Sequence, residues 1–233
     1  MSGTVHDPAN TSDLDLSDDP ACRLYLISPP KIDLRAFYPQ LEEAFDAGDI
    51  GCFQLRLKNV TDDYITGIAE TLLPLAKDRD IPFLINDNPT IASDVGADGV
   101  HIGQEDASYE EARSIVGDKA IIGITCHDSR HMAIVAAEKG ADYVAFGAFY
   151  PTTTKQATSK ANPDILRWWC DTTIVQCAAI GGITIDNCAP LVSAGADFLA
   201  VSAGVWAYKD GPGEAVQAFE EKILHTPRQD PVI

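Results

Sequence analysis

Short runs rich in β-branched and aromatic residues recur along this chain, and stretches with apolar residues at helical spacing lie between most of them. The runs return at intervals of roughly 25 residues, as expected for alternating strands and helices. Strands are predicted at 24–28, 52–57, 82–86, 99–102, 120–125, 143–147, 174–180 and 198–202. Helices are predicted at 36–47, 64–77, 110–116, 131–139 and 189–194, among others. This alternation indicates a parallel sheet with its helices packed outside.

The tripeptide Gly-Ala-Asp occurs at 96–98, 140–142 and 195–197, each time just before a predicted strand. Glycine can end a helix in the left-handed conformation, so each copy is typical of a short loop from helix to strand. Eight strand–helix units in 233 residues match a closed (β/α)8 TIM barrel, which takes about 250 residues. A doubly wound open sheet is the alternative, and the even spacing favours closure.

We predict one barrel domain over residues 22–226, between terminal tails at 1–21 and 227–233. The first twenty residues hold five Asp and neither Lys nor Arg, with little apolar surface to bury. We therefore expect a disordered acidic tail, more simply a solubilising extension than a binding segment. No change of composition divides the rest of the chain, so a second domain is not expected.

Composition and charge exclude several classes of function. With 17 basic and 35 acidic residues, the net charge of −18 disfavours nucleic acid and anionic membranes as partners. No apolar run approaches the roughly 18 residues of a membrane span, and residues 1–20 lack the layout of a signal peptide. Six cysteines without a C-x-x-C motif predict free thiols in a reducing, cytoplasmic environment.

Charged side chains at the second strand give the first indication of chemistry. Residues 52–58 read CFQLRLK, and alternation places Gln54, Arg56 and Lys58 on one face. The apolar face must meet the helices, so the polar face points into the barrel near the mouth where such barrels carry their chemistry. Two cations there need an anion. A bound phosphate is favoured over an internal ion pair with a neighbouring carboxylate.

Two carboxylates follow neighbouring strands. Asp87 lies in the turn NDNP at 86–89, and Asp106 ends the stretch HIGQED. Facing Arg56 and Lys58, this pair suits a Mg²⁺ ion shared with a polyphosphate, because Mg²⁺ takes one or two protein carboxylates and completes its shell with phosphate and water. Salt bridges to the same two bases are the alternative. The asparagines of the turn are equally explained by turn and cap roles.

Hydroxyl-bearing residues lie at the end of the fifth predicted strand and after the sixth. Residues 125–127 read TCH, but neighbours in sequence do not make a nucleophile triad, so a covalent thiol mechanism has no support here. Residues 150–155 read YPTTTK, whose hydroxyls and lysine can surround a phosphate or simply form a hydrophilic loop. Residues 156–162 are expected to be a mobile lid. His101 is interpreted as a hydrogen-bonded core histidine.

Small residues follow the last two strands, IGGI at 180–183 and VSAG at 201–204. Small side chains let backbone N–H groups approach a phosphate closely, as at the common phosphate site of such barrels. The residues alone thus predict two anion sites at one mouth. We expect an enzyme that joins or rearranges two phosphorylated small molecules.

Together these motifs resemble the thiamine-phosphate synthase family, in the family's order over residues 23–208. The strings that carry the resemblance are QLRLK at 54–58, ND at 86–87, GVHIGQED at 99–106, PTTTK at 151–155, IGGI at 180–183 and VS at 201–202. The resemblance implies that hydroxymethylpyrimidine diphosphate and hydroxyethylthiazole phosphate are joined to thiamine phosphate, with release of diphosphate.

The same resemblance implies roles for individual residues. The residues implied to hold the pyrimidine diphosphate are Gln54, Arg56, Lys58, Asn86 and Lys155. Those implied around the thiazole phosphate are Thr152, Thr154, Gly182, Val201 and Ser202. Thr125 stands where the family has a serine, and Asp87 and Asp106 match its Mg²⁺ ligands. Arg56, Lys58, Lys155 and Thr125 are the predicted catalytic residues, because a leaving diphosphate needs positioning and charge neutralisation rather than a nucleophile.

The chain departs from the family's pattern at several positions. Leu57 stands where an acidic residue is usual, and Asn88 stands where a second Asp is frequent. After Lys155 the family's Gly-Leu is missing, and residues 162–169 read NPDILRWW. Adjacent tryptophans cannot share one helix face, so one is expected to pack on the barrel and the other to be exposed or at an interface.

Two other functions compete with a synthase. A thiazole tautomerase would keep the barrel and the thiazole-phosphate pocket, with His127 as a proton carrier, but would have little use for the diphosphate and metal residues. A non-catalytic paralogue would bind thiazole phosphate or thiamine phosphate, a reading that the substitutions at Leu57 and Thr125 favour. The charged residues present here favour the synthase. The predicted partners are small phosphorylated molecules and a second copy of the chain in a homodimer.

Overall fold

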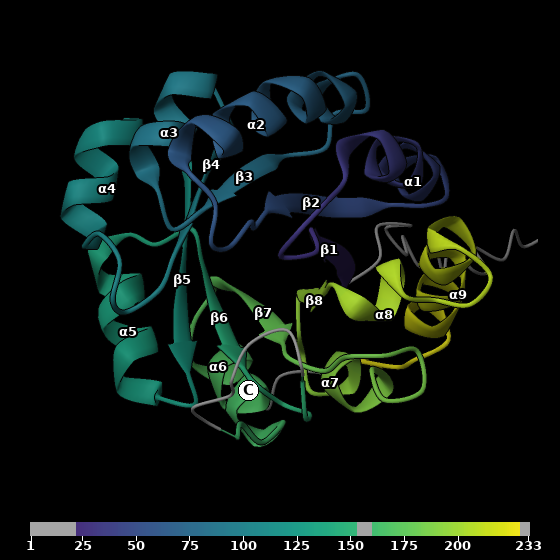
Figure 1. Cartoon of the computed structure of the whole chain (residues 1–233). Coiled ribbons are helices and arrows are strands. Elements are labelled where there is room, and N and C mark those ends of the chain that lie inside the picture. Colours follow the sequence, from purple (N-terminus) through teal and green to yellow (C-terminus); the bar gives the residue numbers. More distant parts are fainter. Residues whose placement is uncertain (1–21, 153–159, 229–233) are drawn as a thin grey trace, which may run out of the picture.

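The computed structural model describes residues 22–152 and 160–228. Eight parallel strands close into a barrel, because each strand pairs with the next in the chain and β1 pairs with β8 (Figure 1). The strands are β1 (Arg23–Ile27), β2 (Ile50–Leu55), β3 (Phe83–Asn86), β4 (Gly99–Ile102), β5 (Ile121–His127), β6 (Tyr143–Gly147), β7 (Gln176–Ile180) and β8 (Phe198–Val201). The predicted (β/α)8 barrel is confirmed, and the closed sheet excludes the doubly wound alternative.

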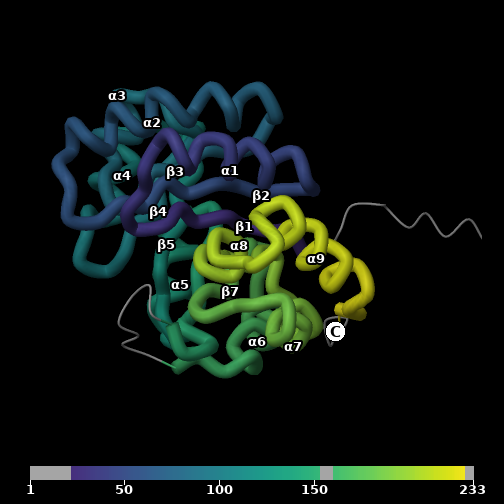
Figure 2. Tube along the Cα trace, turned by 45° about the vertical axis from the view of Figure 1, so that its right-hand side comes forward, coloured from purple at the N-terminus to yellow at the C-terminus, as the bar shows by residue number. Residues whose placement is uncertain are grey.

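The helices surround the barrel (Figures 1 and 2). They are α1 (Leu34–Asp46), α2 (Asp62–Lys77), α3 (Pro89–Val95), α4 (Tyr109–Val116), α5 (Arg130–Lys139), α6 (Asp164–Thr172), α7 (Ala189–Ser193), α8 (Ala203–Trp206) and α9 (Pro212–Leu224). α9 packs beside α1, so the last helix closes the outer ring against the first. No helix in the two described ranges is long and apolar enough to cross a membrane.

Local sequence signals start the helices that follow the site-forming strands. The Asn88 side chain caps α3 by accepting hydrogen bonds from the backbone N–H groups of Thr90 and Ile91, at 3.0 and 3.1 Å. Ser108 and Glu111 form a reciprocal capping box at the start of α4. Such caps satisfy backbone donors that have no partner within the helix. Asn88 is therefore explained by its cap role, although it directly follows Asp87.

The repeated Gly-Ala-Asp segments join helices to strands as predicted, and their aspartates have a further role. Gly96 and Gly140 end α3 and α5 in the left-handed conformation. In all three copies the carboxylate accepts a hydrogen bond from a backbone N–H near the start of the preceding strand, at 2.7–2.8 Å. The pairs are Asp98 with Phe83, Asp142 with Ile122, and Asp197 with Cys177. These bonds tie neighbouring strands together at the end of the barrel opposite the predicted site.

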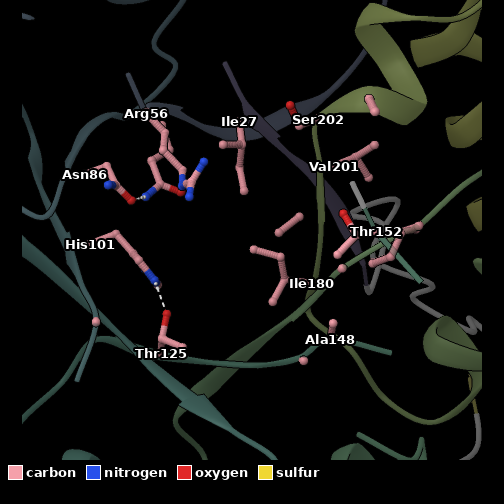
Figure 3. Close-up of a pocket in the computed structure, with 18 of the residues that line it drawn as sticks. Ile27, Arg56, Asn86, His101, Thr125, Ala148, Thr152, Ile180, Val201 and Ser202 are labelled. Carbon is pink, nitrogen blue, oxygen red and sulfur yellow. Dashed lines mark hydrogen bonds between the residues drawn. The ribbon is translucent and has the colours of Figure 1, made fainter. Parts of the chain in front are cut away.

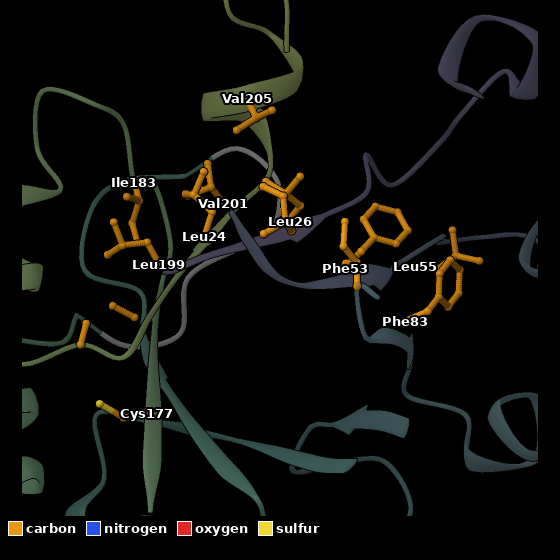
Figure 4. Close-up of a cluster of buried hydrophobic side chains, with 14 of the residues drawn as sticks. Leu24, Leu26, Phe53, Leu55, Phe83, Cys177, Ile183, Leu199, Val201 and Val205 are labelled. Carbon is orange, nitrogen blue, oxygen red and sulfur yellow. The ribbon is translucent and has the colours of Figure 1, made fainter. Parts of the chain in front are cut away.

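Alternation along the strands separates two buried layers. Outward-pointing side chains form the main core between sheet and helices, including Phe53, Phe83 and Leu199 (Figure 4). Inward-pointing side chains form a smaller cluster inside the barrel, including Tyr25, Leu84 and Tyr143. All six cysteines are free thiols, and all except the half-buried Cys170 are buried.

The tryptophan pair of α6 divides as the helix geometry requires. Trp169 is fully buried against Phe146, with its indole N–H donating to the Val175 carbonyl at 2.7 Å. Trp168 is half-buried, and the Arg130 guanidinium lies over its ring at 4.7 Å. The predicted N-terminal tail at 1–21 and most of the predicted C-terminal tail at 227–233 lie outside the described residues. Most of the predicted lid at 156–162 lies outside them as well.

Candidate active site

A pocket opens at the carboxyl ends of the strands, where alternation and strand ends had predicted the site (Figure 3). Every predicted site residue within the described ranges lines it: Gln54, Arg56, Lys58, Asn86, Asp87, Asp106, Thr125, Thr152, Gly182, Val201 and Ser202. Thr154 and Lys155, also predicted, lie outside the described residues. The structure thus brings the described residues together, and their individual roles stay predictions.

The two predicted cations reach the pocket from beyond the end of β2. The strand predicted to run to residue 57 ends at Leu55, because the next backbone groups leave the sheet ladder. The N–H of Arg56 donates to the hydroxyl of Ser28 at 2.8 Å, and that of Lys58 donates to the Pro30 carbonyl at 3.0 Å. Alternation continues through this segment, so both side chains still face the pocket.

Arg56 and Lys58 differ in how they are neutralised. The Lys58 ammonium forms an ion pair with the Asp87 carboxylate. A salt bridge of this kind was the alternative prediction for these charges. The Nη1 atom of Arg56 is buried and has no hydrogen-bond partner among the described residues. Burial lowers the pKa of Arg56, and the nearby Asp87 opposes that shift. A buried guanidinium N–H without an acceptor is costly, so this corner suits an anionic ligand.

The two predicted metal ligands lie close enough for their carboxyl groups to interact. Burial raises the pKa of Asp87, but the hydrogen bond and charge of Lys58 outweigh it, and the net shift is downward. For Asp106, burial and the neighbouring Asp87 raise the pKa against a 2.8 Å hydrogen bond from the Gly103 N–H. Two carboxylates that repel each other suit a shared cation.

The carboxylate pair fits Mg²⁺ better than a metal with an all-protein ligand set. In the described part of the chain, no group of three or more His, Cys, Asp or Glu side chains is arranged to hold a metal. Mg²⁺ commonly takes one or two carboxylates and completes its coordination with phosphate oxygens and water. Asp87 and Asp106, with the cations Arg56 and Lys58 beside them, match that pattern.

The opposite side of the pocket is formed by small residues after β6, β7 and β8. Gly181 and Gly182 have φ of +104° and +65°, in the region that favours glycine. A Cβ atom at Gly181 would lie 2.4 Å from Cβ of Ala148, and one at Gly182 would lie 2.3 Å from the Pro151 carbonyl oxygen. Both positions therefore need glycine for space as well as for backbone conformation.

Hydrogen bonds orient the polar side chains deeper in the pocket. The Gln54 amide N–H donates to the Asn86 amide oxygen at 2.7 Å. The Nε2 atom of His101 and the Thr125 hydroxyl lie 2.7 Å apart. His101 is buried and hydrogen-bonded, as predicted, but it also lines the pocket. Figure 3 shows Arg56, Asn86 and His101 on one side of the pocket.

The predicted set omitted several residues that line the pocket. Ile27 and Ile180 are the last residues of β1 and β7 and supply apolar walls. Their position at strand ends was the available signal, but an isoleucine there reads as core. His127, considered only for a tautomerase, also lines the pocket.

Comparisons with known proteins agree with this geometry. The family model described as thiamine monophosphate synthase matches residues 24–205. A thiamine-phosphate synthase of Rhodospirillum centenum is 57% identical over 198 residues, covering 85% of this chain and 96% of that protein. One of Hyphomonas neptunium is 50% identical over 205 residues, covering 86% and 93%.

A solved structure shares the barrel. The thiamine phosphate pyrophosphorylase from Pyrococcus furiosus superposes with a TM-score of 0.76 at 28% identity, covering 89% of this chain and 98% of that one. Sequence motifs, pocket and comparisons therefore converge, and the resemblance seen in the sequence is confirmed. This chain belongs to the thiamine monophosphate synthase family.

Proposed function

We propose that this protein joins hydroxymethylpyrimidine diphosphate to hydroxyethylthiazole phosphate, forming thiamine phosphate and diphosphate. The observation that carries the proposal is the division of one pocket into two unlike halves. Half-buried Arg56 with Lys58, Asp87 and Asp106 forms a charged half. Small residues around Gly182 form an uncharged half. A reaction between a diphosphate and a monophosphate needs two such anion sites.

The charged half is suited to the diphosphate. The Nη1 atom of Arg56, which has no partner within 22–152 and 160–228, can donate to a phosphate oxygen. Lys58 can exchange part of its pairing with Asp87 for the same ligand. Lys155 is included on the resemblance alone. As the bond between the methylene carbon and the diphosphate oxygen breaks, these cations neutralise the charge that develops on the leaving group.

Asp87 and Asp106 are the residues that would hold Mg²⁺. When bound, the ion supplies further neutralisation of phosphate charge. The protein's own part is to keep the two carboxylates side by side, Asp87 through its pairing with Lys58 and Asp106 through the N–H of Gly103. Loss of either carboxylate should therefore weaken both metal binding and turnover.

The amides and the hydroxyl position the pyrimidine. Gln54, Asn86 and Thr125 offer donors and acceptors to a heterocycle at the bottom of the pocket. An electron-rich aminopyrimidine can carry the positive charge left when diphosphate departs, and the thiazole nitrogen then forms the new bond. No protein nucleophile is required.

The uncharged half is suited to the thiazole phosphate. Gly182 lies after β7, Val201 ends β8 and Ser202 follows it, and Thr152 lies after β6. Without side chains in the way, backbone N–H groups can approach a phosphate closely. We further propose that the protein is cytoplasmic and that it forms a homodimer. A solution mass twice the 25.0 kDa of one chain tests the homodimer.

A turnover assay tests the proposed function. Purified protein, both substrates and Mg²⁺ are combined, and thiamine phosphate is oxidised to its fluorescent thiochrome. We expect product that disappears with a chelator and falls by roughly 10²-fold or more in Asp87→Ala and Lys155→Ala. Asp118→Ala, at an exposed carboxylate with no site contact, is the control.

Other outcomes identify the competing functions. Binding of thiazole phosphate without product would overturn the synthase proposal. Isomerisation of the thiazole, lost in His127→Asn, would then identify a tautomerase, and its absence would identify a binding protein.

A further inference from the structure

A chain of hydrogen-bonded side chains crosses the interior of the barrel beneath the pocket. It joins six strands, and we call it the lumen chain. Its members, in order, are Thr125, His101, Tyr143, Tyr25, Gln54 and Asn86. Both ends line the pocket and belong to the predicted site, whereas the two tyrosines in the middle do not line it.

Every link has hydrogen-bond geometry. Thr125 Oγ1 lies 2.7 Å from His101 Nε2, and His101 Nδ1 lies 2.8 Å from the Tyr143 hydroxyl. The Tyr143 and Tyr25 hydroxyls are 2.7 Å apart. Tyr25 donates to the Gln54 amide oxygen at 3.1 Å, and Gln54 donates to Asn86 at 2.7 Å. The links therefore connect the Thr125 end of the pocket to the Asn86 end.

The Gln54 amide sets the direction in which every hydrogen bond of the lumen chain is donated. An amide oxygen only accepts, so the single hydroxyl proton of Tyr25 is committed to Gln54. Tyr25 must then accept from Tyr143, which leaves Tyr143 as the acceptor for a proton on Nδ1 of His101. In a neutral ring, Nε2 of His101 is then an acceptor, and it receives the proton of Thr125.

This direction determines what each end offers a ligand. The oxygen of Asn86 is occupied by Gln54, so Asn86 presents its N–H groups to the pocket. The proton of Thr125 is directed at His101, so Thr125 presents oxygen lone pairs. A ligand across these ends needs an acceptor facing Asn86 and a donor facing Thr125. A ring nitrogen beside an exocyclic amino group has that pattern.

We propose that Tyr143 and Tyr25 are positioning residues that couple the two ends of the lumen chain and so fix its hydrogen-bonding polarity toward an aminopyrimidine. The inference rests on the proposed function and adds the origin of its selectivity. Exchanging donor and acceptor roles at one end alone would break a hydrogen bond in the middle of the lumen chain. Only a reversal of every link at once would accept a ligand with the opposite pattern.

Packing holds the two tyrosines in place. The Tyr143 ring stacks on His101 with ring centroids 5.6 Å apart and meets Tyr25 edge-on at 5.8 Å. A Cβ atom at Gly123 would lie 1.9 Å from Cζ of Tyr143, so the ring occupies space that only glycine leaves. Burial raises the pKa of both tyrosines well above the usual value, which keeps both hydroxyls protonated.

Discrimination between two pyrimidines tests the coupling. The natural 4-amino pyrimidine diphosphate is compared with its 4-oxo analogue, whose ring N–H and carbonyl present the reverse pattern. The ratio of their kcat/KM values is measured in wild type, Tyr143→Phe and Tyr25→Phe. Because the intrinsic reactivity of the two compounds is the same in all proteins, the change in ratio isolates the effect of the hydroxyls.

We expect the ratio to fall about tenfold in each variant, on the scale of one hydrogen bond, through a loss with the amino compound. Tyr109→Phe is the matched control, because it removes a hydroxyl that donates to the Gly140 carbonyl at 3.0 Å outside the pocket. An unchanged ratio in both tyrosine variants, or equal losses with both pyrimidines, would overturn the inference.

A second measurement needs no turnover. In protein labelled with ¹⁵N-histidine, NMR reports which ring nitrogen of His101 carries the proton, and His101→Asn assigns the signals. We expect protonation at Nδ1 in wild type and a shift toward Nε2 in Tyr143→Phe. A wild-type ring protonated at Nε2, or at both nitrogens, would overturn the polarity. Lack of turnover in every protein would overturn the proposed function alone, and this spectrum would still decide the inference.

Discussion

The half of the pocket formed after β2, β3 and β4 carries its charge on side chains, whereas the half formed after β6, β7 and β8 offers backbone groups and the hydroxyls of Thr152 and Ser202. In the first half, Lys58 is paired with Asp87, and Arg56 has a buried nitrogen that finds no acceptor among the residues the structure describes. In the second, glycines leave room for close approach. Removal of charge should damage the first half most, and addition of bulk the second.

Asp87→Asn should have the largest effect. The change keeps the shape of the side chain but removes one of two carboxylates and the partner of Lys58. We expect kcat to fall by roughly 10²–10³, the scale for loss of one preorganised electrostatic contact. Steady-state kinetics at saturating Mg²⁺ check it, with Asp118→Asn as control. A kcat within a few-fold of wild type would remove the carboxylate pair from the proposed site.

Arg56→Lys should come next. Lysine keeps the charge but loses the fork that offers two parallel hydrogen bonds. We expect kcat/KM for the pyrimidine diphosphate to fall roughly tenfold to hundredfold, the scale of one hydrogen bond to a charged group, with KM for the thiazole phosphate unchanged. Equal losses for both substrates would show that the two halves do not act separately.

Gly181→Ala should reverse that selectivity. The new methyl group would lie 2.4 Å from Cβ of Ala148 at a φ of +104°. We expect a higher KM for the thiazole phosphate and a loss of about 1–3 kcal/mol in the free energy of unfolding. Titration of each substrate and urea unfolding check the two effects. Gly67→Ala in α2 is the matched control, because a Cβ there meets nothing within 4 Å.

Ser202→Ala should change turnover less than these. The Ser202 hydroxyl donates to the Ser28 carbonyl at 3.3 Å and lines the uncharged half. Because backbone groups supply the other donors there, we expect KM for the thiazole phosphate to rise only a few-fold, up to about tenfold. A larger rise, or one in KM for the pyrimidine diphosphate, would contradict the assignment of Ser202 to this half.

Asn88→Ala should leave kinetics unchanged and lower the free energy of unfolding by about 1 kcal/mol, through loss of the α3 cap. Thermal or urea unfolding measures the loss. A fall in kcat instead would place Asn88 in the charged half, beside Asp87, rather than in the helix.

Sequence pattern predicted the fold and the pocket because both depend on strand ends. The limits of β4 and β6 were predicted to the residue, and alternation placed Arg56 and Lys58 correctly. The end of β2 was missed because the Ser28 hydroxyl, 28 positions away, takes the N–H of Arg56. That partner depends on how β1 and β2 lie together, which no local pattern encodes.

The lumen chain lay beyond prediction for a similar reason. Tyr25 and Tyr143 read as ordinary strand aromatics, and Gly123 reads as an interruption of a strand. Tyr25, Tyr143 and Gly123 come into contact only when β1, β5 and β6 take their places in the closed barrel. Similarly, the three Gly-Ala-Asp repeats were noticed for their glycines, while the hydrogen bonds of their aspartates depend on the strand before.

The pairing of β1 with β8 has a consequence for how the chain folds. Leu24 pairs with Leu199, residues separated by 175 positions (199 − 24). Contacts of such long range slow folding, because a large loop must close before they form. During synthesis, the edge of β1 must wait until nearly the whole barrel has left the ribosome, and an unpaired strand edge invites association with other chains. The last strand to emerge therefore ends the period in which the newborn protein is most prone to aggregate.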